Sequence, residues 1–190
     1  MYIKRWLQNC FISQWILLEL AIEKPNLRIW LENAKHKREM LENELNERLK
    51  KVKRFAGSYT ADELRDVELK LFPIFLAVNL NKLDSPGCPW IALAIYTNSI
   101  YVCDSLGDIK PDSKASKGLI NFLELISHDR EFYITKQLQS DTSDMCGEYC
   151  VLFINQMAET NSLHQFISLF TSDMIKNDQI VKFLTKSYKI

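Results

Sequence analysis

The chain has 190 residues, and its 24 Lys and Arg side chains balance its 24 Asp and Glu side chains. A net charge of zero argues against a chain-wide attraction to nucleic acid or to an anionic membrane surface. The hydrophobic fraction of 47% is enough for the core of one domain. Five scattered cysteines form no disulfide framework, so we expect a reduced, intracellular protein, cytoplasmic or nuclear.

Residues 1–54 are predicted to form an N-terminal helical extension, with two helices around Pro25. No signal peptide is expected, and the apolar run over residues 15–22 contains Glu19 and is too short to span a bilayer. The apolar spacing of the second helix favours packing against the main domain, and a surface that binds a partner or a second copy is the alternative. The apolar positions are Leu27, Leu31, Ala34, Leu41, Leu45 and Val52.

Basic residues gather in two places within this extension. Such clusters can contact phosphate groups, but the glutamates between them favour a solvated helix face, and nucleic acid is not a predicted partner. The clusters are His36-Lys37-Arg38 and, over residues 50–54, Lys50, Lys51, Lys53 and Arg54.

Residues 55–190 are predicted to form the main domain. Gly57-Ser58 is interpreted as a break between elements, and residues 60–63 as a helix cap and a short first turn. Thr97-Asn98 predicts a tight hairpin, because asparagine tolerates positive φ. Strands are expected where β-branched and aromatic residues run for strand length, over residues 72–80, 90–96, 99–104 and 131–135.

Helices are expected both before and after these strands, which indicates the α+β class. The helix that begins at Cys146 is apolar almost all round, so we expect it to be buried and central. Ser143 or Asp144 is expected to cap it. The predicted helices cover residues 117–127, 146–159, 163–170, and a last one from a cap at Ser172 to about residue 186.

Cys146 stands at the start of that helix, directly before Gly147. The unpaired N–H groups and the positive end of the helix dipole stabilise a thiolate there, and the N–H groups can also bind an oxyanion. An ordinary buried cysteine is the structural alternative. Cys150, one turn later, is expected to be a core residue. A metal pair with Cys146 is not expected, since no further ligand stands at suitable spacing.

Three segments in this order carry a family resemblance: residues 90–96, residues 101–107, and residues 139–147. Together they resemble the adenain-like cysteine proteases, the adenovirus-type maturation proteases with relatives in virus-like mobile elements. That family shares its fold with the SUMO-specific proteases of ubiquitin-like modifiers. The resemblance covers about residues 57–186, including the tail from Phe170 to Asp178, and leaves out residues 1–54.

The resemblance implies a papain-like, adenain-like fold: a small, mostly antiparallel sheet packed by a buried central helix and flanking helices. It also implies that Cys146 is the nucleophile, Gln139 the oxyanion-hole side chain and Asp104 the acid that orients the base. The family's histidine directly precedes a tryptophan, which here is Trp90. Pro89 stands before it.

Proline cannot transfer a proton, so the implied peptidase lacks its base. General acid–base catalysis contributes on the order of 10²–10⁴-fold, and efficient proteolysis is therefore not expected. His36, His128 and His164 are the histidines of the chain, and none lies on the matching strand. Two functions stay open: an impaired cysteine peptidase, and an inactive, protease-derived binding module. The predicted partner is a protein or peptide, either a viral-type precursor or a ubiquitin-like modifier, with no cofactor, metal or membrane.

Overall fold

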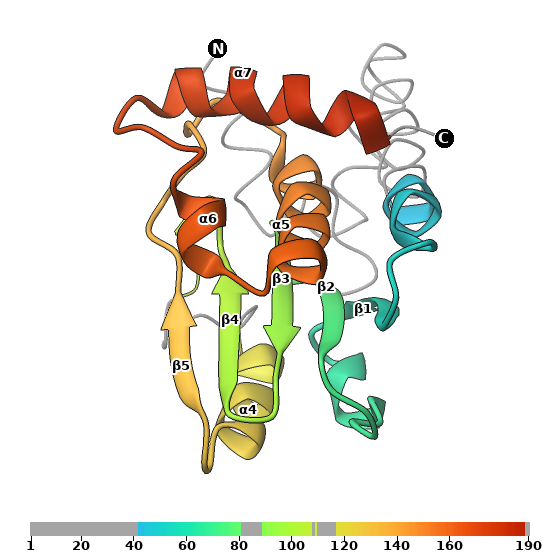
Figure 1. The fold of residues 1–190 in the computed structure, drawn as a ribbon. Helices are drawn as coiled ribbons and strands as arrows, with labels where there is room; N and C mark the ends of the chain where they lie inside the picture. Colours follow the sequence, from blue (N-terminus) through green and yellow to red (C-terminus); the bar gives the residue numbers. More distant parts are fainter. Residues whose placement is uncertain (1–41, 81–88, 108, 110–116, 189–190) are drawn as a thin grey trace, which may run out of the picture.

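A mixed sheet of five strands lies between helices, in the order β1-β2-β3-β4-β5 (Figure 1). The computed structural model describes residues 42–80, 89–107, 109 and 117–188. The predictions for residues 3–41 lie outside this part. The strands are β1 (Phe55–Thr60), β2 (Ile74–Asn79), β3 (Trp90–Ile95), β4 (Ser99–Cys103) and β5 (Glu131–Ile134). The helices are α4 (Lys117–Ile126), α5 (Cys146–Thr160), α6 (Leu163–Ile167) and α7 (Met174–Leu184), with 3-10 turns η1 (Glu63–Asp66) and η2 (Thr185–Tyr188).

The predicted α+β class is confirmed, and the sheet divides evenly between the two kinds of pairing. β3 pairs antiparallel with β2 and with β4, and the predicted hairpin closes with a bond of 2.8 Å from Tyr96 N to Ser99 O. β1–β2 and β4–β5 are parallel pairs. Parallel neighbours need a crossover connection, and α4 lies in the one between β4 and β5. The resemblance implied a mostly antiparallel sheet. The structure instead has two parallel and two antiparallel pairs among the described strands.

Both faces of the sheet are covered at β3, which explains the continuous apolar run of this strand. All six residues of β3 are buried. Ala92 and Ala94 belong to the core on the side of α5, whereas Ile91 and Leu93 belong to the core on the side of α4. A strand buried on both faces carries apolar residues at every position.

Helix α5 is the buried central helix that the sequence predicts. It lies against the sheet, with α6 and α7 placed around it (Figure 1). Phe153 is fully buried and meets the ring of Phe166 from α6 edge to face, with 5.1 Å between the ring centroids. Cys150 is 1% exposed, as expected of a core residue.

Strand β1 was not expected, because its Gly57-Ser58 pair reads as a break. Gly57 adopts a φ of 123°, and the register of β1 against β2 shifts between Phe55 and Gly57. A glycine at positive φ allows a bulge within a strand, so the residue pair that suggests an interruption lies inside the element. The expected turn follows: Thr60 N donates to Glu63 Oε2 over 2.7 Å.

The described end of the N-terminal extension packs into the main core. Residues 42–49 are helical, and Leu45 and Leu49 are buried in the same cluster as α5. Arg48 donates to Glu148 Oε2 of α5 over 2.7 Å. The packing expected of the second helix is thus seen at its described end, and the boundary between residues 54 and 55 stays a prediction.

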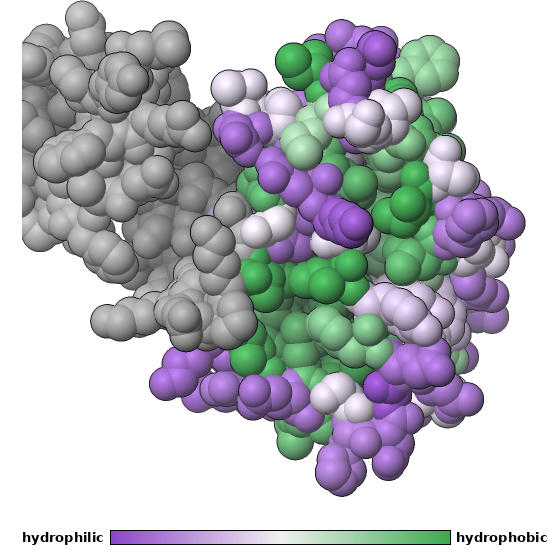
Figure 2. All heavy atoms as spheres, turned by 90° about the vertical axis from the view of Figure 1, so that its left-hand side faces the viewer, coloured by the Kyte–Doolittle hydropathy of each residue, from purple (hydrophilic) through white to green (hydrophobic). Residues whose placement is uncertain are grey.

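Edge strand β5 gives one side of the molecule an apolar surface. Its four residues are exposed, and Phe132, Tyr133 and Ile134 each leave more than two fifths of their surface open. Figure 2 shows hydrophobic side chains gathered in the middle of this side, with hydrophilic residues around them. Among the residues that the structure describes, β4 is its one neighbour in the sheet.

Candidate functional site

The four predicted site positions lie at one end of the fold. Pro89 directly precedes β3, and Asp104 directly follows β4. Because β3 and β4 are antiparallel, the start of the one and the end of the other lie at the same edge of the sheet. Cys146 is the first residue of α5, and Gln139 lies in the loop that leads to it.

Cys146 is held at the helix start against the beginning of β3. Its exposed fraction is 8%. A side chain at Gly147 would place its Cβ 3.8 Å from Cδ1 of Trp90, so the Trp90 ring packs on the first turn of α5. This contact brings the residue before Trp90 towards the nucleophile position. The N–H groups of the first turn face the same end, where they favour negative charge.

The cap of α5 differs from the sequence prediction. The residue before the helix is Met145, at φ −95° and ψ 13°, and its side chain makes no capping hydrogen bond. The backbone bond from Tyr149 N to Met145 O begins the helix. Neither Ser143 nor Asp144 occupies the cap position, because the loop continues to Met145 before it turns into the helix. The first N–H groups of α5 thus have no capping side chain from Met145.

Two buried thiols, those of Cys103 and Cys150, lie in the same core cluster as Cys146. Burial, the largest cause, raises the pKa of Cys150 well above its ordinary value, and the neighbouring Cys103, Cys146 and Asp104 raise it further. Burial also raises the pKa of Cys103. Both side chains therefore stay neutral at pH 7. These mutual influences place Cys103, Cys146 and Asp104 around Cys150.

Gln139 is fully buried and oriented by neighbours on both sides. Its Oε1 accepts from Ser105 Oγ over 2.8 Å, and its Nε2 donates to Ser143 O over 3.0 Å. Its backbone N–H also donates to Ser105 O. A primary amide has two N–H donors, so one remains for a further acceptor. The side chain has the chemistry of an oxyanion-hole donor and a fixed orientation.

Asp104 is buried, and its carboxylate fastens its own loop. Oδ1 accepts from Gly107 N over 2.9 Å, and Oδ2 accepts from Ile109 N over 2.8 Å. Thr135 Oγ1 accepts from the Asp104 backbone N–H at 3.0 Å, which ties β4 to the end of β5. Each carboxylate oxygen can accept more than one bond, so the group can hold this loop and also orient a base.

A network that the sequence did not predict fastens the loop before α5. Tyr149 Oη lies 3.2 Å from Leu138 O and 3.0 Å from Asp178 Oδ1. Asn177 Nδ2 donates to Leu138 O over 3.0 Å, and Ser140 Oγ donates to Asp178 Oδ2 over 2.7 Å. Burial, followed by the charge of Asp178, raises the pKa of Tyr149, so its hydroxyl remains a donor. Asn177 and Asp178 belong to the segment that carries the resemblance, but nothing in the sequence indicates their partners.

Pro89 is compatible with its backbone position. Its carbonyl accepts from Leu80 N over 3.3 Å, one residue beyond the last pair of β2 and β3. Proline has no N–H to return in that pair and is tolerated where a strand begins. It offers no group that takes or gives a proton.

The two described histidines lie away from this end. His128 is exposed in the turn before β5, and the first residue of β5 pairs with Ser99, where β4 starts, at the opposite edge from Asp104. His164 is exposed on α6, which follows the far end of α5. His36 lies outside the described residues. Neither His128 nor His164 stands beside Cys146.

The described residues contain no group of three His, Cys, Asp or Glu side chains that could hold a metal ion. No helix among them is long and apolar enough to cross a membrane.

The comparisons with known proteins identify the fold. The structure is similar to the crystal structure of ASFV pS273R protease, with a TM-score of 0.52, 16% identity and 76% of this chain covered. The chain spans 64% of the length of that protease. The structure is also similar to the SUMO protease Ulp1 with the catalytic cysteine oxidised to a sulfenic acid, with a TM-score of 0.44 and 15% identity. That match covers 78% of this chain and 77% of the Ulp1 chain. No family model matches the sequence, and no curated protein matches it. The likeness to ASFV pS273R protease shows that this chain shares the fold of a protease, as the resemblance implied.

Proposed function

We propose that this chain is a cysteine-peptidase-like protein that receives a protein or peptide at the Cys146 end of α5, and that its hydrolytic activity is impaired. Cys146 would act as the nucleophile, and Gln139 and the first N–H groups of α5 would bind the oxyanion. Asp104 stands where an acid would orient the base, and Pro89 stands where the base would be.

The observation that carries this proposal is the position of Pro89. It shares its sheet edge with Asp104, and the neighbouring Trp90 packs on the first turn of α5. A histidine there would lie at the same end of the sheet as Asp104, next to the residue that packs on the first turn of α5. Without it, the thiol lacks the group that takes its proton and later protonates the leaving amine. We expect the loss to be on the order of 10²–10⁴-fold.

A direct test compares the wild-type chain with Pro89→His. Position 89 can gain an N–H opposite Leu80, so the substitution suits the backbone. We expect Pro89→His to increase the rate at which iodoacetamide alkylates Cys146 at pH 7, read by mass spectrometry, and to increase cleavage of a fluorogenic ubiquitin-like conjugate. Pro89→His/Cys146→Ala should lose that cleavage. Thr97→His is the matched control, since it adds a histidine at the opposite edge of the sheet.

Two outcomes would count against the proposal. Cleavage by the wild-type chain that depends on Cys146 would show that the site works without a histidine at position 89. Equal alkylation rates in wild type, Pro89→His and Thr97→His would show that position 89 does not reach the thiol.

A binding module without catalysis is the second candidate. It is favoured by the hydrogen bonds of Asp104, whose two carboxylate oxygens each accept from a loop N–H, and of Gln139, which is fastened on both sides. These bonds preserve the shape of the site whether or not a reaction occurs. Cys146→Ala should then bind a ubiquitin-like modifier as tightly as the wild-type chain. Loss of binding in Cys146→Ala would instead indicate that the thiol takes part.

A further inference from the structure

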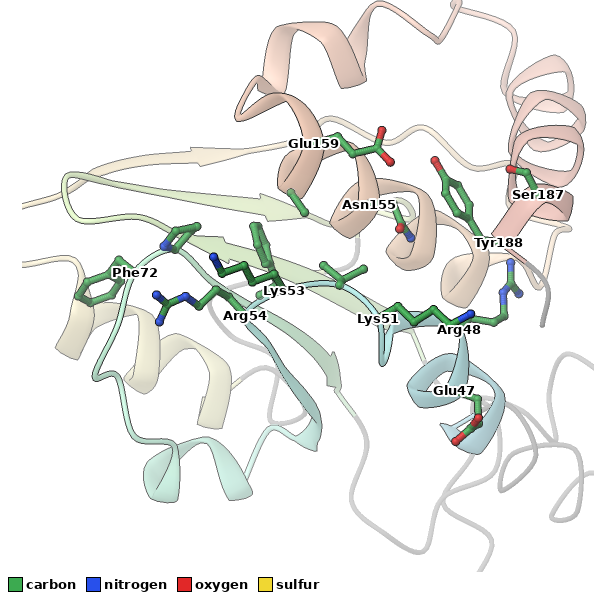
Figure 3. A pocket seen from close by; sticks show the side chains of 14 residues that line it. Glu47, Arg48, Lys51, Lys53, Arg54, Phe72, Asn155, Glu159, Ser187 and Tyr188 are labelled. Carbon is green, nitrogen blue, oxygen red and sulfur yellow. The ribbon is translucent and has the colours of Figure 1, made fainter.

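A pocket lies towards the far end of α5, away from Cys146. It has a volume of about 550 Å³ and opens between residues 47–54, the start of β2, the last turns of α5, and η2 (Figure 3). Pockets that bind small molecules have volumes of about 300–1,000 Å³, so this one is suited to a small molecule rather than to a folded protein.

One side of this pocket carries unpaired positive charge. Lys51, Lys53 and Arg54 line it, and none of them forms an ion pair within the described part of the chain. Two other cations of the same segment are paired: Arg48 with Glu148, and Lys50 with Glu47. Some positive charges of this segment are therefore paired within the chain. The three unpaired ones, Lys51, Lys53 and Arg54, all line the same cavity.

Arg48 adds a buried donor to the same pocket. Its exposed fraction is 9%, and its two terminal nitrogens donate to Glu44, Glu148 and Thr185 O. Its buried Nε–H has no hydrogen-bond partner. A buried donor without a partner is costly, and the chain itself does not offset that cost here.

The backbone is strained at one of the three cations. Arg54 adopts a φ of 74°, a conformation in which glycine or asparagine is usual. A non-glycine residue held there costs on the order of 1 kcal/mol, and such strain is concentrated at functional sites. The bonds from Phe75 N to Arg54 O and from Phe55 N to Val52 O fix this conformation. The sequence thus keeps an arginine where the backbone alone would favour glycine.

The remaining walls differ in chemistry from the basic side. The half-buried Phe72 and Pro73 form an apolar wall, next to the fully buried Phe75. Glu159 and Tyr188 lie across from Lys53 and Arg54, on α5 and η2 (Figure 3). The pocket therefore combines cations, an apolar surface and two carboxylates: Glu47, which is paired with Lys50, and Glu159, which can accept from hydroxyl or amino groups.

We propose that this pocket binds a small organic phosphate with two or more phosphate groups. The phosphates would lie against Lys51, Lys53 and Arg54, and the organic body against the wall of Phe72 and Pro73. A single carboxylate would leave most of this charge unbalanced, whereas a polyphosphate matches it and the arginine fork suits phosphate oxygens. The site is separate from Cys146 and goes beyond the proposed function.

Isothermal titration calorimetry of the full chain tests this proposal with three probes: ATP, inorganic tripolyphosphate and adenosine. ATP should bind most tightly, tripolyphosphate less tightly and adenosine weakly. Lys53→Gln/Arg54→Gln should weaken ATP binding about tenfold or more, since each lost charge-assisted bond removes a large part of the affinity. Lys117→Gln/Lys136→Gln removes the same charge outside the pocket and should leave ATP affinity unchanged.

Three results would overturn the proposal. Equal weakening in the two double variants would mean that ATP follows the general charge of the protein. If tripolyphosphate binds as tightly as ATP, the apolar wall adds no affinity, and the ligand need not be an organic phosphate. Absence of binding by both phosphate probes at millimolar concentration would exclude the site. Circular dichroism of both variants confirms that each is folded.

Discussion

The two ends of helix α5 differ in whether the polar side chains around them have partners within the chain. At its start, the buried polar groups of the loop find partners within the chain: Gln139 bonds to Ser105 and Ser143, and Asp178 receives Tyr149 and Ser140. At its end, a cavity is lined by cations that have no ion-pair partner among the described residues.

This difference shows that an ordered loop and a reactive or binding group can occur independently in this fold. The Cys146 end keeps an ordered loop although Pro89 offers no base, so the order of the loop does not depend on catalysis. The pocket end leaves charge and backbone strain unresolved within the chain. A polar group that the protein does not satisfy indicates a ligand more directly than one that it does.

The largest expected effect concerns the anchor of the basic segment. Leu49 is fully buried against the core of α5. Leu49→Ala should lower the free energy of unfolding by about 2–5 kcal/mol, because it removes apolar contact and leaves a cavity. Urea denaturation measures this change. Leu125→Ala, at a position that is 77% exposed, is the control and should stay within about 0.5 kcal/mol. Equal effects would mean that residues 45–49 do not belong to the cooperative core.

Asn177→Ala would break the loop network at the other end of α5. The side chain donates to Leu138 O and Thr171 O and accepts from Thr171 N, so its removal leaves buried backbone groups without partners. We expect a loss of about 1–3 kcal/mol in unfolding free energy. Hydrogen exchange of residues 138–145 should accelerate as well.

The exposed Asn121 on α4 provides the control for that variant. Asn121→Ala should change neither the unfolding free energy nor the exchange of residues 138–145. Unchanged exchange in Asn177→Ala would show that the loop is held by its other contacts alone.

Tyr149→Phe gives a smaller effect with a distinct pH signature. Burial and Asp178 raise the pKa of Tyr149 above its ordinary value of 10.0. The unfolded chain therefore ionises this group first, and its contribution to stability is complete below pH 10 and is lost as the pH rises above it. At pH 7, Tyr149→Phe should cost about 1 kcal/mol, the value of one hydrogen bond.

The check is the difference in unfolding free energy between wild type and Tyr149→Phe, measured from pH 7 to 11. The difference should shrink above pH 10. The raised pKa values of Cys103 and Cys150 add a slope in alkali, but both proteins share it. A difference that stays constant with pH would show that Tyr149 ionises alike in the folded and unfolded chains.

The elements that rest on local patterns could be predicted from the sequence. The apolar run after Cys146 predicts a buried helix, and Thr97-Asn98 predicts the hairpin between β3 and β4; both are confirmed. Strand β1 could not be predicted, because Gly57 serves a bulge inside the strand. A glycine looks the same in a sequence whether it ends a strand or bends one.

The candidate site could be predicted only in part from the sequence, for a different reason. Cys146, Gln139 and Asp104 follow from spacing and from the resemblance. The contact of Asn177 with Leu138 joins residues 39 positions apart, and the basic pocket joins residues 51–54 to η2. No local pattern encodes such pairings, since they depend on how α7 and the N-terminal extension close around α5. Charge alone suggested a solvated face for residues 50–54, and only the fold shows that three of the cations line a cavity.

The smallest expected effect completes the comparison between the two ends. Without any ligand, Lys53→Gln/Arg54→Gln should change the unfolding free energy by no more than about 0.5 kcal/mol, because exposed cations without partners contribute little. Relief of repulsion between neighbouring positive charges favours a slight gain at low salt, which should fade as salt screens it. Urea denaturation in 20 mM and 300 mM KCl measures both. A clear loss of stability at either salt concentration would show that these cations serve the fold. The contrast with the start of α5, where Asn177 and Tyr149 are expected to support the structure, would then no longer hold.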